Sequence, residues 1–288
     1  MRPHDRHLLA GSLAILLLWA SSGRVSAQLP LGLMTFNIRT AYVDDGENSW
    51  PNRKALVAQT IERSAPDVVG LQEVIREQVE YLASALKDYR WIGVDRGLNG
   101  GQGLSEYTPI FYRFAELSPI ESGTFWLSPT PDVPSTAEPR LGRIVTWARF
   151  HHRATGRQFY AFNTHFSPRT GPGQLDAARI IKERLNRLPP GSAVILLGDF
   201  NSSAEESPVW RDLTGDFLRD AWTTAEEHRG PPATMGGFGP PRPGDTARID
   251  WILVGGPIQV HSVETVLYNE GGRYPSDHFP VAARVDIR

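Results

Sequence analysis

Several short apolar runs of this chain begin or end at the same few polar residue types, and this feature constrains its fold more than any other. A continuous run of roughly four to eight apolar residues is typical of a buried strand. At the ends of such runs the sequence carries Asp199, Asn201, Asp250, Asp277 and His278. Because strand ends at one edge of a sheet lie close together, we expect these side chains to converge on one pocket.

Strand-like and helix-like patterns alternate along the chain, which predicts an α/β fold. Strands are predicted over 31–38, 67–71, 108–113, 143–151, 157–166, 193–197, 248–254, 259–267 and 279–287. Helices are predicted over 51–63, 75–86 and 174–188. The proline-rich segments 128–141 and 230–245 are predicted loops. Because chemistry-bearing segments lie on both sides of each loop, we expect one domain.

The first 27 residues have the pattern of a secretory signal peptide. Arg2 and Arg6 precede an apolar stretch over 8–20, and small residues lead up to Ala27. This stretch is too short to span a bilayer comfortably, which favours a cleaved leader over a retained anchor or a buried helix. We therefore expect a leader over 1–27 and one domain over 28–288. The protein would be secreted or periplasmic, without stable membrane insertion after cleavage.

The lack of cysteine and the balance of charge exclude several classes of protein. Disulfides, thiolate catalysis and cysteine-based zinc sites are excluded because the chain has no cysteine. The 30 basic and 32 acidic residues give a formal net charge of −2, which does not suit binding of nucleic acid through bulk positive charge. A polyanionic substrate would have to be attracted by a local basic patch or by a metal ion.

Two further strand ends carry residues suited to a hard metal ion. Asn37 follows the first predicted strand and Glu73 follows the second. Mg²⁺ prefers oxygen ligands, and one or two carboxylates together with water and substrate phosphate are sufficient. Each residue also has a structural explanation, Asn37 as a turn cap and Glu73 as a first-turn acid stabilised by the helix dipole.

Three residues suit the orientation of water and phosphate. Asp199 and Asn201 are two positions apart after a strongly apolar strand, so extended geometry would put them on one side. An Asp/Asn turn after the strand is the simpler alternative. His165 lies in an otherwise apolar strand and, taken alone, would more often be a core residue than a catalyst.

The last two motifs suit proton transfer. Asp250 lies within an apolar strand, and a buried carboxylate needs a partner, which either Arg248 or His278 could provide. A carboxylate beside His278 would fix the imidazole tautomer and raise its basicity. Pro280 makes a central strand interior implausible here, so Asp277 and His278 are expected at a junction between a loop and a strand.

In this order, these residues resemble the endonuclease/exonuclease/phosphatase superfamily, which includes DNase I-like nucleases, bacterial sphingomyelinases, inositol polyphosphate 5-phosphatases and CCR4-type deadenylases. The resemblance covers about residues 31–287 and rests on short motifs in family order. It implies a single-domain, four-layer α/β/β/α sandwich. The motifs Asn163-Thr164-His165 and Tyr274–Pro280 are most similar to the deadenylase-like branch and to small exported bacterial members.

The resemblance also implies a role for each candidate residue. The implied metal-side residues, for Mg²⁺ or Mn²⁺, are Asn37, Glu73 and Asp277. Asp199 and Asn201 would orient water and phosphate. His165 would assist the leaving group or bind phosphate, and His278, paired with Asp250, would act as the general base.

The sequence therefore predicts a metal-dependent phosphoesterase that uses activated water, and a nuclease is the favoured hypothesis. Such an enzyme would resemble a 3′-to-5′ exonuclease and act on RNA or DNA. Nucleic acid would need a basic groove near the site. The arginines that could form this groove are Arg39, Arg140, Arg143 and Arg169.

Two other classes remain open. An extracytoplasmic phosphoesterase acting on a phospholipid, in the manner of a sphingomyelinase, or on a sugar or inositol phosphate is the alternative. A lipid enzyme would expose aromatic side chains at the rim of the site, and Trp126 and Phe238 are the candidates. A binding protein without activity would lack at least one catalytic residue, and none is missing.

Overall fold

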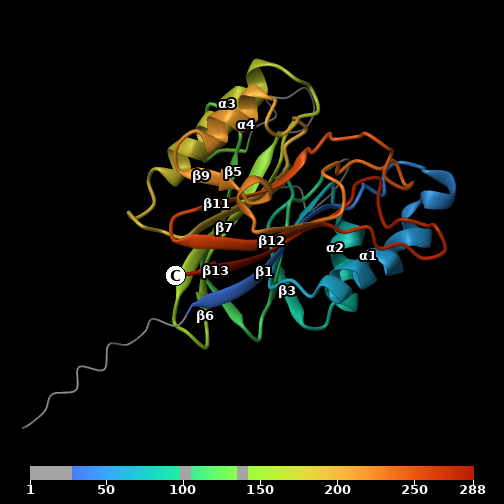
Figure 1. Cartoon of the computed structure of the whole chain (residues 1–288), viewed down its shortest axis with the longest axis horizontal. Coiled ribbons are helices and arrows are strands. Elements are labelled where there is room, and N and C mark those ends of the chain that lie inside the picture. Colours follow the sequence, from blue (N-terminus) through green and yellow to red (C-terminus); the bar gives the residue numbers. More distant parts are fainter. Residues whose placement is uncertain (1–27, 98–104, 135–141) are drawn as a thin grey trace, which may run out of the picture.

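The computed structural model describes residues 28–97, 105–134 and 142–288, which form two β-sheets packed face to face with helices on both outer faces (Figure 1). Helices α1 (Trp50–Ser64) and α2 (Arg76–Ala85) cover the first sheet, and α3 (Pro172–Leu185) and α4 (Pro208–Thr214) cover the second. This arrangement confirms the single-domain, four-layer α/β/β/α sandwich. The leader predicted over 1–27 lies outside the described residues and stays a prediction.

Both sheets are mixed, with β1 parallel to β2 and β7 parallel to β8. The first sheet has the order β10 (Glu227–Arg229), β12 (Ile258–Thr265), β13 (Val281–Ile287), β1 (Leu29–Asn37), β2 (Val68–Gln72), β4 (Ile110–Arg113), β3 (Tyr89–Ile92). The second has the order β5 (Leu117–Trp126), β6 (Ile144–His152), β7 (Gln158–His165), β8 (Val194–Asp199), β11 (Asp250–Gly255), β9 (Leu218–Asp220). The short helices are η1 (Gly46–Asn48) and α5 (Ala221–Thr224).

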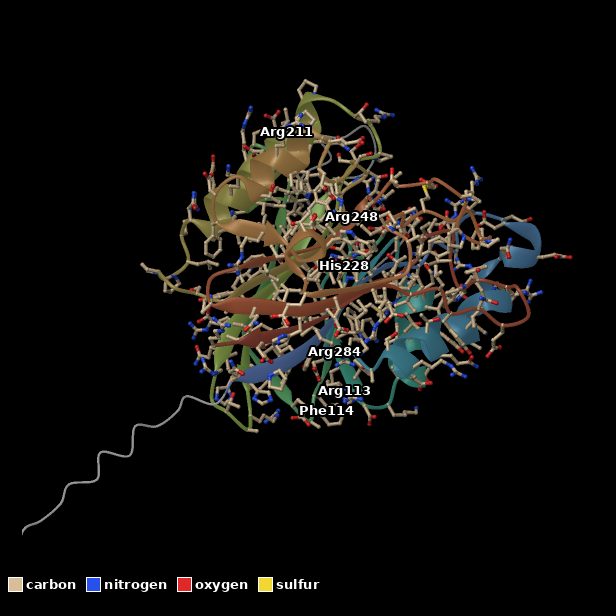
Figure 2. The ribbon with its side chains drawn as sticks, viewed as in Figure 1. Arg113, Phe114, Arg211, His228, Arg248 and Arg284 are labelled. Atoms are coloured by element: carbon tan, nitrogen blue, oxygen red, sulfur yellow. The ribbon has the colours of Figure 1, made fainter. Side chains whose placement is uncertain are left out.

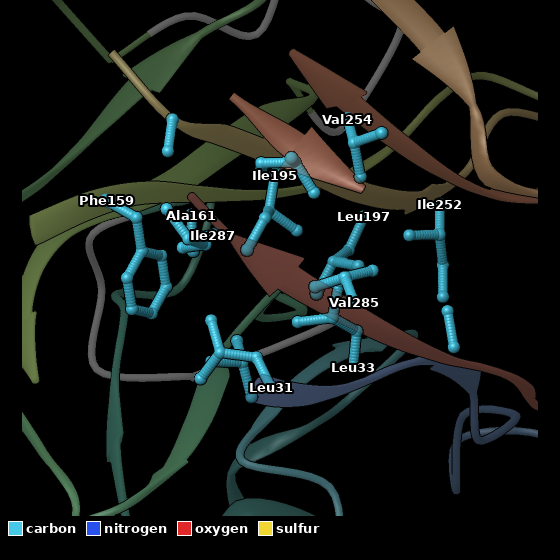
Figure 3. Close-up of a cluster of buried hydrophobic side chains, with 14 of the residues drawn as sticks. Leu31, Leu33, Phe159, Ala161, Ile195, Leu197, Ile252, Val254, Val285 and Ile287 are labelled. Carbon is cyan, nitrogen blue, oxygen red and sulfur yellow. The ribbon is translucent and has the colours of Figure 1, made fainter. Parts of the chain in front are cut away.

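The space between the sheets is filled by apolar side chains from alternate strand positions. Leu31 and Leu33 of β1 belong to one buried cluster with Ile195 and Leu197 of β8 (Figure 3). Burial of each such side chain stabilises the fold by about 1.5–3 kcal/mol. Because side chains alternate between faces, the residue two positions beyond Leu197 points the same way. That residue is Asp199, at the edge of the core.

The predicted strands and helices are all present, with boundaries that differ by a few residues. The sequence does not predict the strands β3, β5, β9 and β10 or the short helices η1, α4 and α5. Strand β5 lies at a sheet edge, its middle is exposed, and its pairing is irregular between Pro119 and Glu121. Edge strands tolerate proline and bulges, which is why the apolar alternation is weak there.

Local signals set the ends of the outer helices. Helix α1 has proline in its first turn and ends at Ala65, whose backbone is left-handed. The hydroxyl of Ser207 caps α4 by accepting a hydrogen bond from the Trp210 backbone N–H. Within the described ranges, none of the helices combines the length and the apolar character needed to cross a bilayer.

Candidate active site

Three neighbouring strands of the second sheet bring a histidine and two aspartates side by side. His165 ends β7, Asp199 ends β8 and Asp250 begins β11, and Asp199 is the register partner of both other residues. Leu197 and Ile252, two positions away from the aspartates, are in the core between the sheets. The two carboxylates therefore point from the edge of the core toward the first sheet.

The first sheet presents its own polar residues at the same edge. Asn37 ends β1, where it is the register partner of Gln72, and Glu73 follows directly. The Asn37 amide Nδ2 donates to Asp199 Oδ2 at 2.9 Å and to Glu73 Oε1 at 3.2 Å. One side chain thus links the polar ends of both sheets.

The segment before β13 supplies the remaining candidates. Ser276 Oγ donates to the Asn37 carbonyl at 2.7 Å, which fixes this segment against the end of β1. Asp277 Oδ2 then lies 3.7 Å from an Arg39 guanidinium nitrogen. His278 Nδ1 lies 2.9 Å from Asp250 Oδ2, and both side chains are buried. The eight predicted residues therefore lie in one cluster, although their catalytic roles stay predictions.

The His278–Asp250 contact perturbs the histidine strongly. Burial acts to lower the pKa of His278, but attraction and hydrogen bonding to Asp250, together with the charges of Asp199 and Asp277, raise this pKa to about 10. In the absence of a cation, the imidazole therefore carries a proton at neutral pH. Its Nε2 lies 4.0 Å from Asp199 Oδ2, so the imidazolium lies between two carboxylates.

Asp199 is perturbed in the opposite sense to an ordinary surface acid. Burial and the neighbouring Asp250 raise the pKa of Asp199 to about 7, although His278, Asn37 and the Asn201 backbone N–H act to lower it. A carboxyl that titrates near neutrality suits proton transfer. The close packing of acidic groups is also what a bound cation would relieve.

His165 is held as a neutral imidazole. Burial, followed by the charges of Arg143, Arg96 and His278, lowers its pKa well below the usual range. Its Nε2 lies 3.1 Å from Asn201 Nδ2 and 3.6 Å from Asp199 Oδ2. Because the ring is neutral, the latter approach is not an ion pair. A neutral ring that contacts Asn201 is suited to hydrogen bonding with phosphate or a leaving group.

Three turns at this edge have left-handed backbone at residues other than glycine. The φ angles are 57° at Arg39, 59° at Glu73 and 46° at Asn201. Such conformations cost free energy and persist where surrounding contacts enforce them. Here Asn37 Oδ1 accepts from the Arg39 N–H, and Asp199 Oδ1 accepts from the Asn201 N–H. These turns fix how each side chain enters the site.

A layer of amides supports the site from between the sheets. Gln72 Nε2 donates to Asn163 Oδ1 at 2.7 Å, and Asn163 Nδ2 donates to the Leu71 carbonyl. Gly70 makes this approach possible, because a Cβ at that position would lie 2.6 Å from Asn163 Oδ1. Asn163, in the same motif as His165, therefore has a structural role, because its amide links the two sheets below the site.

The residues present fit a divalent metal ion. Oxygen ligands are available from Glu73 and Asp277, with Asn37 between the sheets, and hard cations prefer such ligands. One ligand atom each from Asp199, Asp250 and His278 also lie within 4.8 Å of one another. Within the described chain, Asp250 Oδ1 is buried without a hydrogen-bond partner, as expected of an oxygen atom that can coordinate a metal ion.

Asn37 departs in one respect from its predicted role. Its amide nitrogen, rather than its oxygen, faces Glu73 and Asp199, because two carboxylates attract a donor when no cation lies between them. Amide oxygen and nitrogen are nearly isosteric, so a half-turn of this group presents the oxygen instead.

Contacts outside the catalytic cluster rule out two of the sequence-based alternatives, Arg248 as the partner of Asp250 and Trp126 as an exposed rim residue. Arg248, labelled in Figure 2, is not the partner of Asp250, because its guanidinium binds Asp220 at 2.7 Å and Glu205 at 3.0 Å. Trp126 does not form an exposed rim: it is buried, and its Nε1 donates to the Arg96 carbonyl. Arg140 lies outside the described residues.

Sequence reasoning missed Asp45 and Arg96 as charged residues near the site, and it named Arg39 only as a candidate for a basic groove. Arg39 pairs with Asp45 at 3.0 Å as well as approaching Asp277. Arg96 pairs with Glu106 at 3.2 Å, and both are mostly buried. The only sequence signal for this pair was the polar stretch before β4, which resembles an ordinary loop.

A cavity of about 710 Å³ opens beside Asn201. Its walls come from the starts of α3 and α4, the loop after β8 and the residue before β11, and they include Leu175, Val209 and Ile249. Its size suits one small organic group. Asn201 lies between this cavity and His165, so a group held here would border the catalytic cluster.

Comparison with known proteins relates this architecture to one family. The model of the Endonuclease/Exonuclease/phosphatase family matches residues 34–278. A Bacteroides vulgatus endonuclease/exonuclease/phosphatase is 32% identical with a TM-score of 0.84, over 90% of this chain and 100% of that chain. A Bacteroides thetaiotaomicron mannosyl-6-phosphatase is 29% identical with a TM-score of 0.82, over 88% of this chain and 99% of that chain.

Three further proteins also match this chain. An uncharacterized protein of Acanthamoeba polyphaga mimivirus is 29% identical in a match of 168 residues that covers 53% of this chain and 59% of that protein. Zebrafish (D. rerio) TDP2 and human Nocturnin are 19% and 21% identical, both with a TM-score of 0.69, and share the fold. The chain belongs to the endonuclease/exonuclease/phosphatase family, whose members are hydrolases of phosphate esters.

Proposed function

We propose that this protein is an exported, divalent-metal-dependent phosphatase that releases phosphate from a sugar phosphate. The observation that carries the substrate class is the 29% identity, over most of both chains, to a protein described as a mannosyl-6-phosphatase. The cluster of His165, Asp199, Asn201, Asp250 and His278 supports hydrolysis by water. The leader-like residues 1–27 support export.

The nuclease hypothesis becomes the second candidate. The nucleic-acid-related neighbour, TDP2 with single-stranded DNA product, is only 19% identical, a level at which the likeness concerns the fold. Of the arginines expected in a basic groove, Arg39 is neutralised by Asp45 and Asp277. The lipid hypothesis is weaker again, since Trp126 is buried and Phe238 packs under the Arg53 guanidinium.

The metal-side residues would hold the ion on the first sheet. Glu73 and Asp277 offer carboxylate oxygens there, with Asn37 between them and Asp199. When bound, Mg²⁺ or Mn²⁺ would neutralise charge on the phosphate oxygens and on the departing oxygen. The chain's own part is to fix these ligands, which the hydrogen bonds from Thr40 N–H to Glu73 and from Ser276 to the Asn37 carbonyl support.

The proton-transfer groups come from both sheets: Asp199 and Asp250 lie on the second sheet, and His278 lies in the segment before β13 of the first sheet. His278, oriented by Asp250, takes a proton from water as predicted, provided that positive charge bound nearby offsets the carboxylates that raise its pKa. Asp199, with a pKa of about 7, is the competing base. Asn201 and neutral His165 hydrogen-bond the phosphate oxygens or the leaving oxygen and hold the ester for in-line attack.

A substrate panel tests the proposal. The purified protein is incubated with mannose 6-phosphate, glucose 6-phosphate, bis(4-nitrophenyl) phosphate and a 5′-labelled oligo(A), with Mg²⁺, with Mn²⁺ or with EDTA. Metal-dependent phosphate release from a sugar phosphate that disappears in His278→Ala is the expected result. Shortening of the oligonucleotide with no release of sugar phosphate would replace the phosphatase by the nuclease.

A further inference from the structure

A group of buried charges borders the catalytic cluster on the His165 side. Arg143 immediately precedes β6, and the pairing of Val145 with Thr164 places the start of β6 beside the end of β7. Thr164 Oγ1 donates to the Ile144 carbonyl at 3.0 Å, which fixes this junction. Arg143 therefore lies at the same sheet edge as His165, and its charge helps to lower the histidine pKa.

Two nitrogens of the partly buried Arg143 side chain have no hydrogen-bond partner within the described ranges. Its Nε and Nη1 atoms are buried and make no hydrogen bond. A charged group that is withdrawn from water without a partner is costly, so native proteins rarely leave one unsatisfied. Buried donors of this kind at the edge of an active site indicate that an anion completes the arrangement.

Arg96 adds a second guanidinium that is only partly satisfied. Its Nη2 lies 3.2 Å from Glu106 Oε2, whereas its Nε is buried without a hydrogen-bond partner. Backbone bonds hold this unit in place, from Arg96 N–H to the Glu106 carbonyl at 2.9 Å and from Trp126 Nε1 to the Arg96 carbonyl at 3.0 Å. Glu106 also interacts electrostatically with Arg143, so one carboxylate serves two guanidinium groups and one positive charge is left over.

We propose that Arg143, with Arg96 held behind it by Glu106, forms an anion subsite that binds the non-esterified oxygens of a terminal phosphate. The proposal rests on the phosphatase function above, and it predicts a preference for phosphomonoesters over phosphodiesters. A guanidinium offers parallel N–H donors that match two phosphate oxygens.

The preference follows from charge and shape. A phosphomonoester carries about 1.5 to 2 negative charges at pH 7 and has three free oxygens, whereas a diester carries one charge and two free oxygens. The subsite adds positive charge beyond the metal side of the cluster.

Two measurements on the same variants test the subsite. Binding of inorganic phosphate to the metal-free protein is measured by calorimetry, and kcat/KM is compared for 4-nitrophenyl phosphate and bis(4-nitrophenyl) phosphate with Mg²⁺. Arg143→Ala should weaken phosphate binding and monoester turnover by about 10- to 100-fold, the value of a hydrogen bond to a charged group. Diester turnover should change several-fold less.

Matched variants separate a binding role from a structural one. Glu106→Gln keeps an oxygen near Arg96 but removes the negative charge, so it should bind phosphate at least as tightly as the unaltered protein. Arg143→Lys should recover part of the affinity, and Arg179→Gln, on the exposed face of α3, is the control. If Arg143→Ala does not fold, Arg143→Lys and Glu106→Gln are compared instead. The lysine variant should bind phosphate more weakly than the unaltered protein, and the glutamine variant should not.

The outcomes also distinguish this proposal from the proposed function. Unchanged phosphate affinity in Arg143→Ala, or equal losses on monoester and diester, would overturn the subsite even if the protein is a phosphatase. An unaltered protein that binds phosphate through Arg143 but releases none from a sugar phosphate would overturn the proposed substrate class and leave the subsite standing.

Discussion

Two regions that are two residues apart on the same strand differ in almost every physical property. At Leu197 the space between the sheets is apolar and closed, whereas at Asp199 it holds acidic groups, two histidines and a buried carboxylate oxygen without a partner. Backbone geometry differs as well, since left-handed residues follow the strand ends. The comparison teaches that a regular core provides the stability with which a strained, charged edge is maintained.

The largest expected effect separates activity from stability at the edge. His278→Ala and Asp250→Asn should each lower kcat/KM by about 100- to 10,000-fold, because general acid–base catalysis is lost. The melting temperature of Asp250→Asn should stay near that of the unaltered protein, because the amide oxygen can still accept a hydrogen bond from His278 and repulsion with Asp199 is relieved. His278→Ala leaves two buried carboxylates uncompensated and should melt lower, so Asp250→Asn tests the division of activity from stability. Steady-state kinetics and thermal unfolding are compared on the same samples, and a large parallel fall in the melting temperature of Asp250→Asn would contradict this division.

The reverse behaviour is expected in the core. Leu197→Ala should lower the free energy of unfolding by about 2–5 kcal/mol, because a buried cluster between the sheets loses methyl groups and gains a cavity. Urea denaturation measures this loss. Activity per folded molecule should change by less than that of the edge variants. A loss of activity as large as in His278→Ala would show that core and edge are not separable.

Metal binding should stabilise the charged edge and so reduce the difference in stability between edge and core. Mg²⁺ at about 100 times its dissociation constant should stabilise the protein by about 2.7 kcal/mol, because it binds the folded edge and relieves repulsion between carboxylates. Thermal unfolding with Mg²⁺ and with EDTA measures the shift. Asp277→Asn should lose most of it, and an exposed control, Asp176→Asn on α3, should keep it.

The smallest effect tests the strain at the edge. Glu73 has a φ of 59°, so Glu73→Gly should stabilise the metal-free protein by about 1 kcal/mol, the lower end of the cost of such a conformation. The same variant should lose Mg²⁺-dependent stabilisation and activity. Denaturation in EDTA provides the measurement, and a destabilised metal-free variant would mean that the contacts of Glu73 outweigh the strain.

Much of the candidate site could be predicted because each residue lies where an apolar run begins or ends. Asp199 and Asp250 follow this rule directly, and the strand ends do meet at one edge. The rule fails for Trp126, since an aromatic residue near a loop can be buried by a distant contact, here with the Arg96 carbonyl. It also fails for Glu106, whose surroundings in the sequence resemble an ordinary loop.

By itself, the sequence determined the order of the main strands and helices and the identity of the polar strand ends, because apolar periodicity is a local property of the chain. Only the tertiary structure decided the pairing. Asn37 and Asp199 are 162 residues apart, and their contact depends on sheet order and register. The tertiary structure also pairs Asp250 with His278 rather than with Arg248. Within the described chain, it leaves two buried nitrogens of Arg143 without a hydrogen-bond partner. Such long-range choices are made when the sheets pack, and no short segment of the chain encodes them.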